Sequence, residues 1–235
     1  MILLCGTLIV FAQLNYMRRQ SLGVRTDRIL VVKFPGPTEG MKIKMEAMRK
    51  AIRKLPLVSK VTCSGSVPGE EVAMFLSNRR THDALKQNRL YEMLSCDPDY
   101  MDAYGLELVA GRGFSEDYGD DVNKLVINET AARTLGYTDY ESVIGEEISV
   151  ETIEEPMQVI GVVKDYHQQA LNRNYTPIML FHKDKIDWIP QRYISIVMKP
   201  GDSLELVSQI SEIWTTYFAD SSFDYFFLDQ FYDRQ

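Results

Sequence analysis

Acidic, aromatic and glycine residues gather in the stretch DPDYMDAYGLELVAGRGFSED, from Asp97 to Asp117. This composition suits a metal-binding loop, a phosphate-binding loop, a pair of catalytic carboxylates or a structural turn. Calcium loops place oxygen ligands at alternating positions and close with a carboxylate. The acidic cluster at its end does not follow that pattern; it contains Glu116, Asp117, Asp120 and Asp121. We therefore expect a solvated loop there rather than a calcium site.

Phosphate binding has no better support. The chain contains no Gly-Lys-Ser/Thr sequence, which a P-loop requires. The segment Gly111-Arg112-Gly113 has two glycines without the third of a dinucleotide fingerprint, and it does not open a predicted helix. We expect no nucleotide or phosphate site in this chain.

Asp165-Tyr166-His167 is the second place where side chains could do chemistry, since it follows the apolar run MQVIGVV. An Asp/His pair at a strand end can act as acid and base. No partner nucleophile is evident, because Ser64-Gly65-Ser66 lacks the flanking glycine of a nucleophile elbow. The histidines are scattered, and no His-x-x-x-His pair or Cys-x-x-Cys pair is present. We therefore expect a structural or partner-contact role for this turn, and no catalytic, cofactor or metal site.

The composition is that of a folded chain, with 45% hydrophobic and 25% charged residues among 235. A formal net charge of −7 argues against nucleic acid as a partner, because phosphate binding needs a basic surface. Cys63 and Cys96 could form a disulfide in an oxidising compartment. Two small buried residues are the reading we favour.

The N-terminus is strongly apolar: MILLCGTLIVFA precedes NYMRRQ. About twelve apolar residues are too few to cross a bilayer, which takes about twenty. We expect residues 1–17 to be the distal part of a transmembrane helix; a buried core helix is the alternative. The basic residues that follow would by the positive-inside rule face the cytoplasm; they are Arg18, Arg19, Arg25 and Arg28.

Both ends of the remaining chain predict strand–helix–strand units. Residues 28–34 and 58–63 alternate or run apolar as strands do, and between them Met41, Met45, Met48, Ile52 and Leu55 mark one face of a helix. The basic residues of that helix are expected on its solvated face; they are Lys42, Lys44, Arg49, Lys50, Arg53 and Lys54. Residues 192–199 and 223–228 flank a second helix, with Asp202 as its cap. We predict one split β-α-β (ferredoxin-like) subdomain from residues 28–69 and 191–230.

Residues 70–190 then form an inserted, strand-rich α+β module. Strands are expected at 88–96 and 124–128 and in EEISVE, MQVIGVVKD and TPIMLFH. LELVAGRGF is expected to be extended, with its glycines at a turn, and ETAARTLG to be a short helix. A short helix is expected over 98–104, with Asp97 as its cap and Gly105 at its end. Asn128 matches a glycosylation sequon, but a helix cap after its strand is the more plausible role.

Taken in order, these pieces resemble the extracytoplasmic domain of MacB/FtsX-type ABC transporter permeases, especially the long versions of Bacteroidetes-like bacteria. The resemblance rests on QLNYMRRQSLGVRTDRILVV, DPDYMDAYGLELVAGRGFSED, LVINETAARTLG, VIGEEI and QVIGVVKDYHQQAL. The positions that match the family's motifs, read as structural, are Asp97, Tyr100, Gly105, Gly111, Arg112, Phe114, Asn128, Gly145, Gly161, Asp165 and His167.

The resemblance implies a membrane-proximal porter subdomain from both ends of the loop and an inserted sabre subdomain. It implies a non-enzymatic inner-membrane protein with this domain in the periplasm, against the reading of the basic flank. ATP would be bound by a separate cytoplasmic ABC ATPase. Other partners implied are a second permease copy or second periplasmic loop, and an adaptor with an outer-membrane duct. The cargo stays open, and so does a membrane-anchored sensor or ligand-binding domain as the alternative.

Overall fold

The computed structural model describes residues 22–36, 40–83, 87–118, 121–169, 173–186 and 189–234. The predicted transmembrane segment 1–17 lies outside these ranges. Within them, no helix combines the length and apolar character needed to cross a bilayer.

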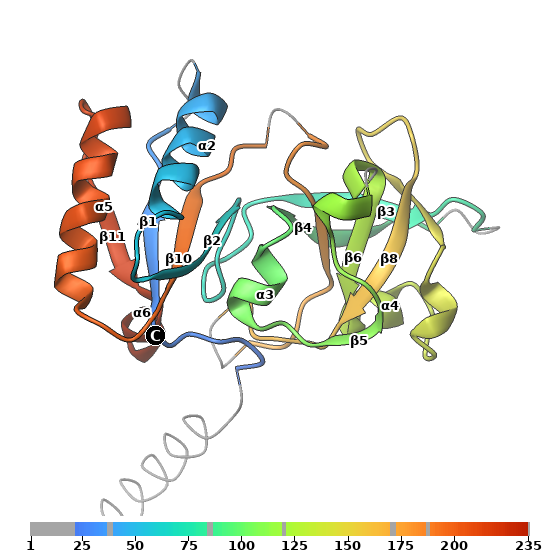
Figure 1. The fold of residues 1–235 in the computed structure, drawn as a ribbon. Coiled ribbons are helices and arrows are strands. Elements are labelled where there is room, and N and C mark those ends of the chain that lie inside the picture. Colours follow the sequence, from blue (N-terminus) through green and yellow to red (C-terminus); the bar gives the residue numbers. More distant parts are fainter. Residues whose placement is uncertain are drawn as a thin grey trace, which may run out of the picture.

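The two chain ends meet in one antiparallel group of four strands with the order β11-β1-β10-β2 (Figure 1). The strands are β1 (Ile29–Lys33), β2 (Val58–Ser64), β10 (Tyr193–Met198) and β11 (Asp224–Phe227). Helix α2 (Met41–Ile52) connects β1 to β2, and α5 (Ser203–Tyr217) connects β10 to β11. Each strand–helix–strand unit therefore contributes two strands that are not neighbours, which is how the two units interlock.

Helices α2 and α5 cover the same face of these strands (Figure 1). The predicted apolar stripe of α2 is confirmed, since Met45, Met48 and Ile52 are buried there against Leu30 and Val32. Asp202 caps α5 as expected, because its carboxylate accepts hydrogen bonds from the backbone N–H groups of Leu204 and Glu205.

The inserted residues form a closed ring of six hydrogen-bonded strands, in the order β4-β3-β7-β8-β6-β9 and back to β4. Their bounds are β3 (Phe75–Arg80), β4 (Arg89–Cys96), β6 (Lys124–Asn128), β7 (Glu147–Val150), β8 (Met157–Val163) and β9 (Ile178–His182). Strand β5 (Leu108–Gly111) adds to β8 from outside the ring. The ring has its own apolar core, which includes Leu125, Ile127, Val159, Met179 and Phe181.

The remaining helices of the described residues are short: α3 (Tyr100–Tyr104), α4 (Glu129–Thr134), α6 (Leu228–Asp233) and the 3-10 turns Glu116–Tyr118, Asp121–Asn123 and Glu141–Val143. Strand β3 and helix α6 had no counterpart among the sequence predictions. The whole is a mixed α+β fold rich in strands.

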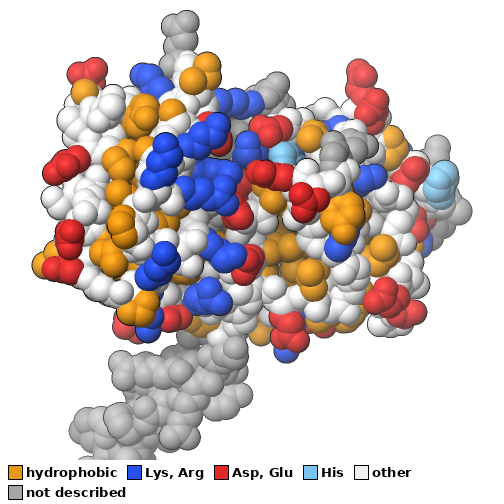
Figure 2. All heavy atoms as spheres, in the orientation of Figure 1, with side chains coloured by type: hydrophobic (Ala, Val, Ile, Leu, Met, Phe, Trp, Pro, Cys, Tyr) orange, Lys and Arg blue, Asp and Glu red, His pale blue; other side chains and the backbone are white. Residues whose placement is uncertain are grey.

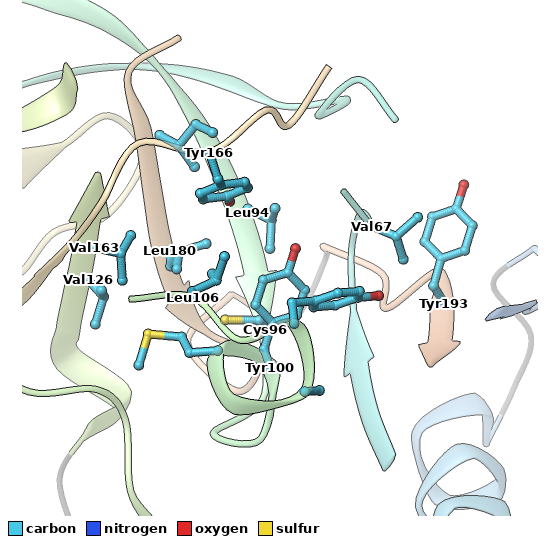
Figure 3. Close-up of a cluster of buried hydrophobic side chains, with 14 of the residues drawn as sticks. Val67, Leu94, Cys96, Tyr100, Leu106, Val126, Val163, Tyr166, Leu180 and Tyr193 are labelled. Carbon is cyan, nitrogen blue, oxygen red and sulfur yellow. The ribbon is translucent and has the colours of Figure 1, made fainter. Parts of the chain in front are cut away.

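A third apolar core, which we call the junction core, joins the ring to the four-stranded part. Figure 3 shows Tyr100 and Cys96 between Leu180 and Val126 of the ring and Val67 and Tyr193 of the other part. Ser64 pairs with Cys96 where β2 meets β4, and the backbone N–H groups of Gly65 and Asp97 donate to the carbonyls of Ser95 and Cys63 on either side. Side-chain packing in this core adds to these backbone contacts.

The two cysteines of this region are free and buried. Cys63 packs in the core under α2 and α5, whereas Cys96 packs in the junction core. The possible Cys63–Cys96 disulfide is therefore not present in this structure, because the two side chains belong to different cores.

Candidate functional site

Asp97 lies at the end of β4 and has no exposed surface. Its carboxylate accepts three hydrogen bonds from the four-stranded part of the molecule. Arg49 Nη1 of α2 donates to Oδ2 at 2.8 Å, the Cys63 backbone N–H donates to Oδ2 at 2.9 Å, and the Thr62 hydroxyl donates to Oδ1 at 2.5 Å. The predicted role of Asp97 as a cap of the short helix is wrong, since α3 begins only at Tyr100 and the carboxylate points to α2 and β2 instead.

The electrostatics of this group follow from its burial. Loss of water raises the pKa of the Asp97 carboxyl above its ordinary value, and the hydrogen bonds from Thr62, Cys63 and Arg49 act in the opposite direction. A buried carboxylate is tolerated when its lone pairs are satisfied in this way. Through these contacts Asp97 links the inserted part to α2 and β2.

Two more ion pairs continue from Asp97 along the surface. Arg53 Nη2 lies 2.6 Å from Asp99 Oδ2, and Lys60 contacts Asp102. Figure 2 shows Lys and Arg side chains gathered on the face that carries α2. These outer pairs are partly exposed, so each contributes little to stability. We call Arg49–Asp97, Arg53–Asp99 and Lys60–Asp102 the junction pairs.

Arg49 is the residue that the sequence prediction placed wrongly, on a solvated face. Its side chain is 6% exposed. A signal was present, because Arg49 follows Met45 by four residues and precedes Ile52 by three, which puts it on the buried stripe. A charged residue within an apolar stripe points to a buried partner.

Several residues after Asp99 in the segment from Asp97 to Asp117 pack in the junction core. Tyr100 is fully buried with its ring centroid 4.8 Å from that of Tyr104, whose hydroxyl is hydrogen-bonded to Ser195 Oγ of β10 at 2.6 Å. Gly105 ends α3 with φ +64°, as predicted for a left-handed C-terminal residue. This segment is therefore a structural turn whose acids are ion-paired.

The second half of the motif forms a close backbone crossing. Gly111 has φ +65°, and a Cβ at Gly161 would lie 2.1 Å from the Arg112 carbonyl oxygen. Arg112 binds Asp121 with both terminal nitrogens, at 2.9 and 2.7 Å, and Phe114 packs near His182 at 6.2 Å between ring centroids. The absence of a side chain at Gly111 and Gly161 lets β5 approach β8 closely. The Asp121 carboxylate is ion-paired with Arg112.

The Arg112–Asp121 pair predicts a pH-dependent stability. The hydrogen bond from Arg112 lowers the pKa of Asp121. An acid with a lowered folded-state pKa contributes stability above its unfolded pKa, about 3.9, and loses it as the pH falls through the folded value. We expect Asp121→Asn to reduce the free energy of unfolding by about 1 kcal/mol at pH 7, discounted because Arg112 is partly exposed.

Denaturant unfolding at pH 7, 5 and 3 measures this effect. The difference between wild type and variant should shrink toward pH 3, and Asp117→Asn, in the same segment but exposed, should change little. A difference that stays constant with pH would refute the assigned ion pair.

Asn128 and Asp165 hold the start of α4. Asn128 Oδ1 accepts hydrogen bonds from the N–H groups of Ala131 and Ile178, both at 2.9 Å, which confirms the predicted cap. Asp165 accepts from the Thr130 N–H at 2.9 Å and from Arg133 Nη2 at 2.5 Å. Gly145, with φ +90°, donates its N–H to the Val159 carbonyl at 2.8 Å and so ends the turn before β7.

His167 and Asp165 contact different residues. Its ring packs on Tyr175 at 4.7 Å between centroids, and burial lowers the pKa of His167. No hydrogen bond joins these two described side chains. Among the described residues, no group of three or more His, Cys, Asp or Glu side chains is placed to hold a metal ion. The Asp165 carboxylate and the His167 ring therefore make separate contacts, the first with α4 and the second with Tyr175.

Known proteins share this fold. A family model described as the MacB-like periplasmic core domain matches residues 2–212. The periplasmic region of MacB from Actinobacillus actinomycetemcomitans superposes with a TM-score of 0.63 at 14% identity, covering 93% of this chain and 97% of that chain.

Two further structures are similar. The extracellular domain of the ABC-type transporter YknZ from Gram-positive bacteria has a TM-score of 0.58 and 16% identity, covering 84% of this chain and 97% of that one. A domain of a predicted permease protein from Porphyromonas gingivalis has a TM-score of 0.57 and 20% identity, covering 85% and 89%. A search of curated proteins finds no match. At these identities the structures establish the fold, while the family model spans most of the sequence, so the chain belongs to the family of MacB-like periplasmic core domains.

Proposed function

We propose that this chain is the periplasmic domain of an inner-membrane ABC transporter permease and that it transmits movement rather than catalysing a reaction. The observation that carries the proposal is the buried Arg49–Asp97 pair at 2.8 Å, which fastens the inserted ring to helix α2. A domain that transmits force needs parts that stay joined, and a buried ion pair is costly to separate because each charge would be left without its counter-charge.

The strand order suggests which part of the chain would form the porter subdomain and which the sabre subdomain. The four-stranded part, residues 28–69 and 191–230, is built from the two terminal portions of the fold and would be the porter subdomain beside the membrane. The ring, within residues 70–190, would be the sabre subdomain further out. Interlocked strand–helix–strand units in the order β11-β1-β10-β2, with both helices on one face, support the ferredoxin-like description of the porter part.

The partners follow from the family. A separate cytoplasmic ABC ATPase would bind ATP, and this chain would carry no cofactor of its own. Closure of the ATPase dimer would move the membrane helices and, through them, the porter part of two facing permease copies or loops. The movement would serve export through a periplasmic adaptor and an outer-membrane duct, lipoprotein release, or activation of another periplasmic protein.

Distance measurements between spin labels test the coupling. Full-length permease is assembled with its ATPase after replacement of the native cysteines, and a label is placed on exposed Leu204 of α5. We expect the distance between labels on two copies to change when ATP is trapped by a hydrolysis-deficient ATPase. A second label pair within one copy joins exposed Leu204 to exposed Leu90 of the ring. Its distance should stay the same, because the proposal requires the two parts to move as one body. An unchanged distance between copies would contradict the proposal.

A membrane-anchored ligand-binding sensor is the alternative. A cavity beside α2, of about 670 Å³, is the observation that favours it. The sensor reading expects ligand binding without any response of the domain to ATP.

A further inference from the structure

A cavity of about 670 Å³ opens where the four-stranded part meets the ring. One wall is the first half of α2, and the other is formed by Lys183, Asp184 and residues 189–191. The apolar side chains that line it are Pro35, Met41, Ile43, Met45, Ile189 and Pro190. This volume is within the range of small-ligand sites.

Two buried polar atoms of the lining residues have no hydrogen-bond partner among the described residues. They are Arg49 Nε, a donor, and Gln191 Oε1, an acceptor. Arg49 Nε lies 3.7 Å from Glu46 Oε2, which is too far for a hydrogen bond, and Gln191 uses its Nε2 to donate to Ser95 Oγ. Leaving such atoms unsatisfied is unfavourable, and a ligand could supply the missing partners. Both atoms are buried, so a ligand would reach them after side chains that line the cavity rotate aside.

Charges around the cavity balance. Lys42 and Lys183 are matched by Glu46 and Asp184, and Arg49 is neutralised by Asp97. A strongly charged ligand therefore finds no excess of opposite charge. The two methionines supply flexible walls that adapt to side chains of different shape.

We propose that this cavity binds an uncharged, apolar peptide segment. A peptide backbone offers both groups that the cavity lacks, a carbonyl for the Arg49 Nε–H and an N–H for Gln191 Oε1. An alkyl chain offers neither group, and a carboxylate offers acceptors only. The proposal concerns binding and does not depend on mechanical coupling, so its failure would leave the distance measurement above unaffected.

The test uses the full-length permease in detergent and a fluorescent pentapeptide of alternating leucine and alanine with both ends capped. Fluorescence anisotropy measures its affinity. Ile43→Ser removes an exposed apolar side chain at the cavity and should weaken binding roughly tenfold. The matched control is Leu204→Ser, which removes an equally exposed apolar side chain from the start of α5; it should change affinity less than twofold.

A depsipeptide, in which esters replace the amide N–H groups, tests the hydrogen bond to Gln191. It should bind the wild type several-fold more weakly than the peptide does, while Gln191→Leu should bind both equally. Thermal unfolding of each variant establishes that it is folded.

Three results would overturn the proposal. The first is no binding of the peptide at millimolar concentration, and the second is equal binding when glutamate or lysine replaces the leucines. The third is displacement of the peptide by palmitate together with equal affinity for the depsipeptide, which would assign the cavity to lipid chains.

Discussion

Replacement of Arg49 by methionine should reduce the free energy of unfolding by about 3 kcal/mol. The substitution keeps most of the apolar stem that packs in α2 but leaves the Asp97 carboxylate buried with the Thr62 hydroxyl and the Cys63 N–H as its remaining donors. A buried charge that loses its counter-charge is among the costliest single changes in a protein. Denaturant unfolding of the chain at pH 7 measures the loss.

Arg53→Met is the matched control, since Arg53 follows Arg49 by four residues at the C-terminal cap of α2 and pairs with Asp99 in a partly exposed position. It should cost no more than about 1 kcal/mol. The double variant Arg49→Met/Asp97→Asn should regain part of the stability lost by Arg49→Met, because the uncompensated charge is gone. A loss below 1 kcal/mol for Arg49→Met, or the absence of any recovery, would show that the pair does not fasten the junction.

Gly111→Ala should be the second large effect, with a loss of about 2–5 kcal/mol. The backbone at Gly111 has φ +65°, which costs a non-glycine residue about 1–2 kcal/mol. A Cβ there would also lie 2.2 Å from the Ile160 carbonyl oxygen, and relief of such a clash with backbone adds about 1–3 kcal/mol. The shift in the midpoint of thermal or denaturant unfolding reports the sum.

Gly136→Ala separates the two contributions. Gly136 also has a positive φ, of +97°, but no atom lies within 4 Å of the position of its Cβ. The loss at Gly136 should therefore reflect backbone strain alone and should be smaller than that at Gly111. Equal losses at both sites would mean that the crossing of β5 and β8 is not close-packed as described.

The regular elements could be predicted because each depends on local patterns. The apolar stripe of α2, the strand that became β6, and the caps Asn128 and Asp202 are decided by neighbours a few residues away. Strand β3 escaped prediction for the opposite reason. Its Asn78 is fully buried, with its amide facing the sulfur atoms of Met93 and Met179 at 3.2 and 3.3 Å, and those residues come from other strands.

The motif residues show where local reasoning stops. Helix-capping rules favoured a cap role for Asp97, since an acidic residue stands just before a short helix. The carboxylate instead accepts a hydrogen bond from Arg49, 48 positions earlier in the sequence. A buried charge is stable only with an opposite charge or several hydrogen bonds, and these partners come from distant segments.

By itself, then, the sequence determined the α+β class, the paired strand–helix–strand ends, the turn glycines Gly105 and Gly111, and the likeness to a permease domain. The tertiary structure decided the closed ring of six strands, the junction pairs and the cavity between the two parts. The physical reason is range: periodicity and caps act within a few residues, whereas ring closure, buried ion pairs and cavities arise from contacts between segments far apart in the chain.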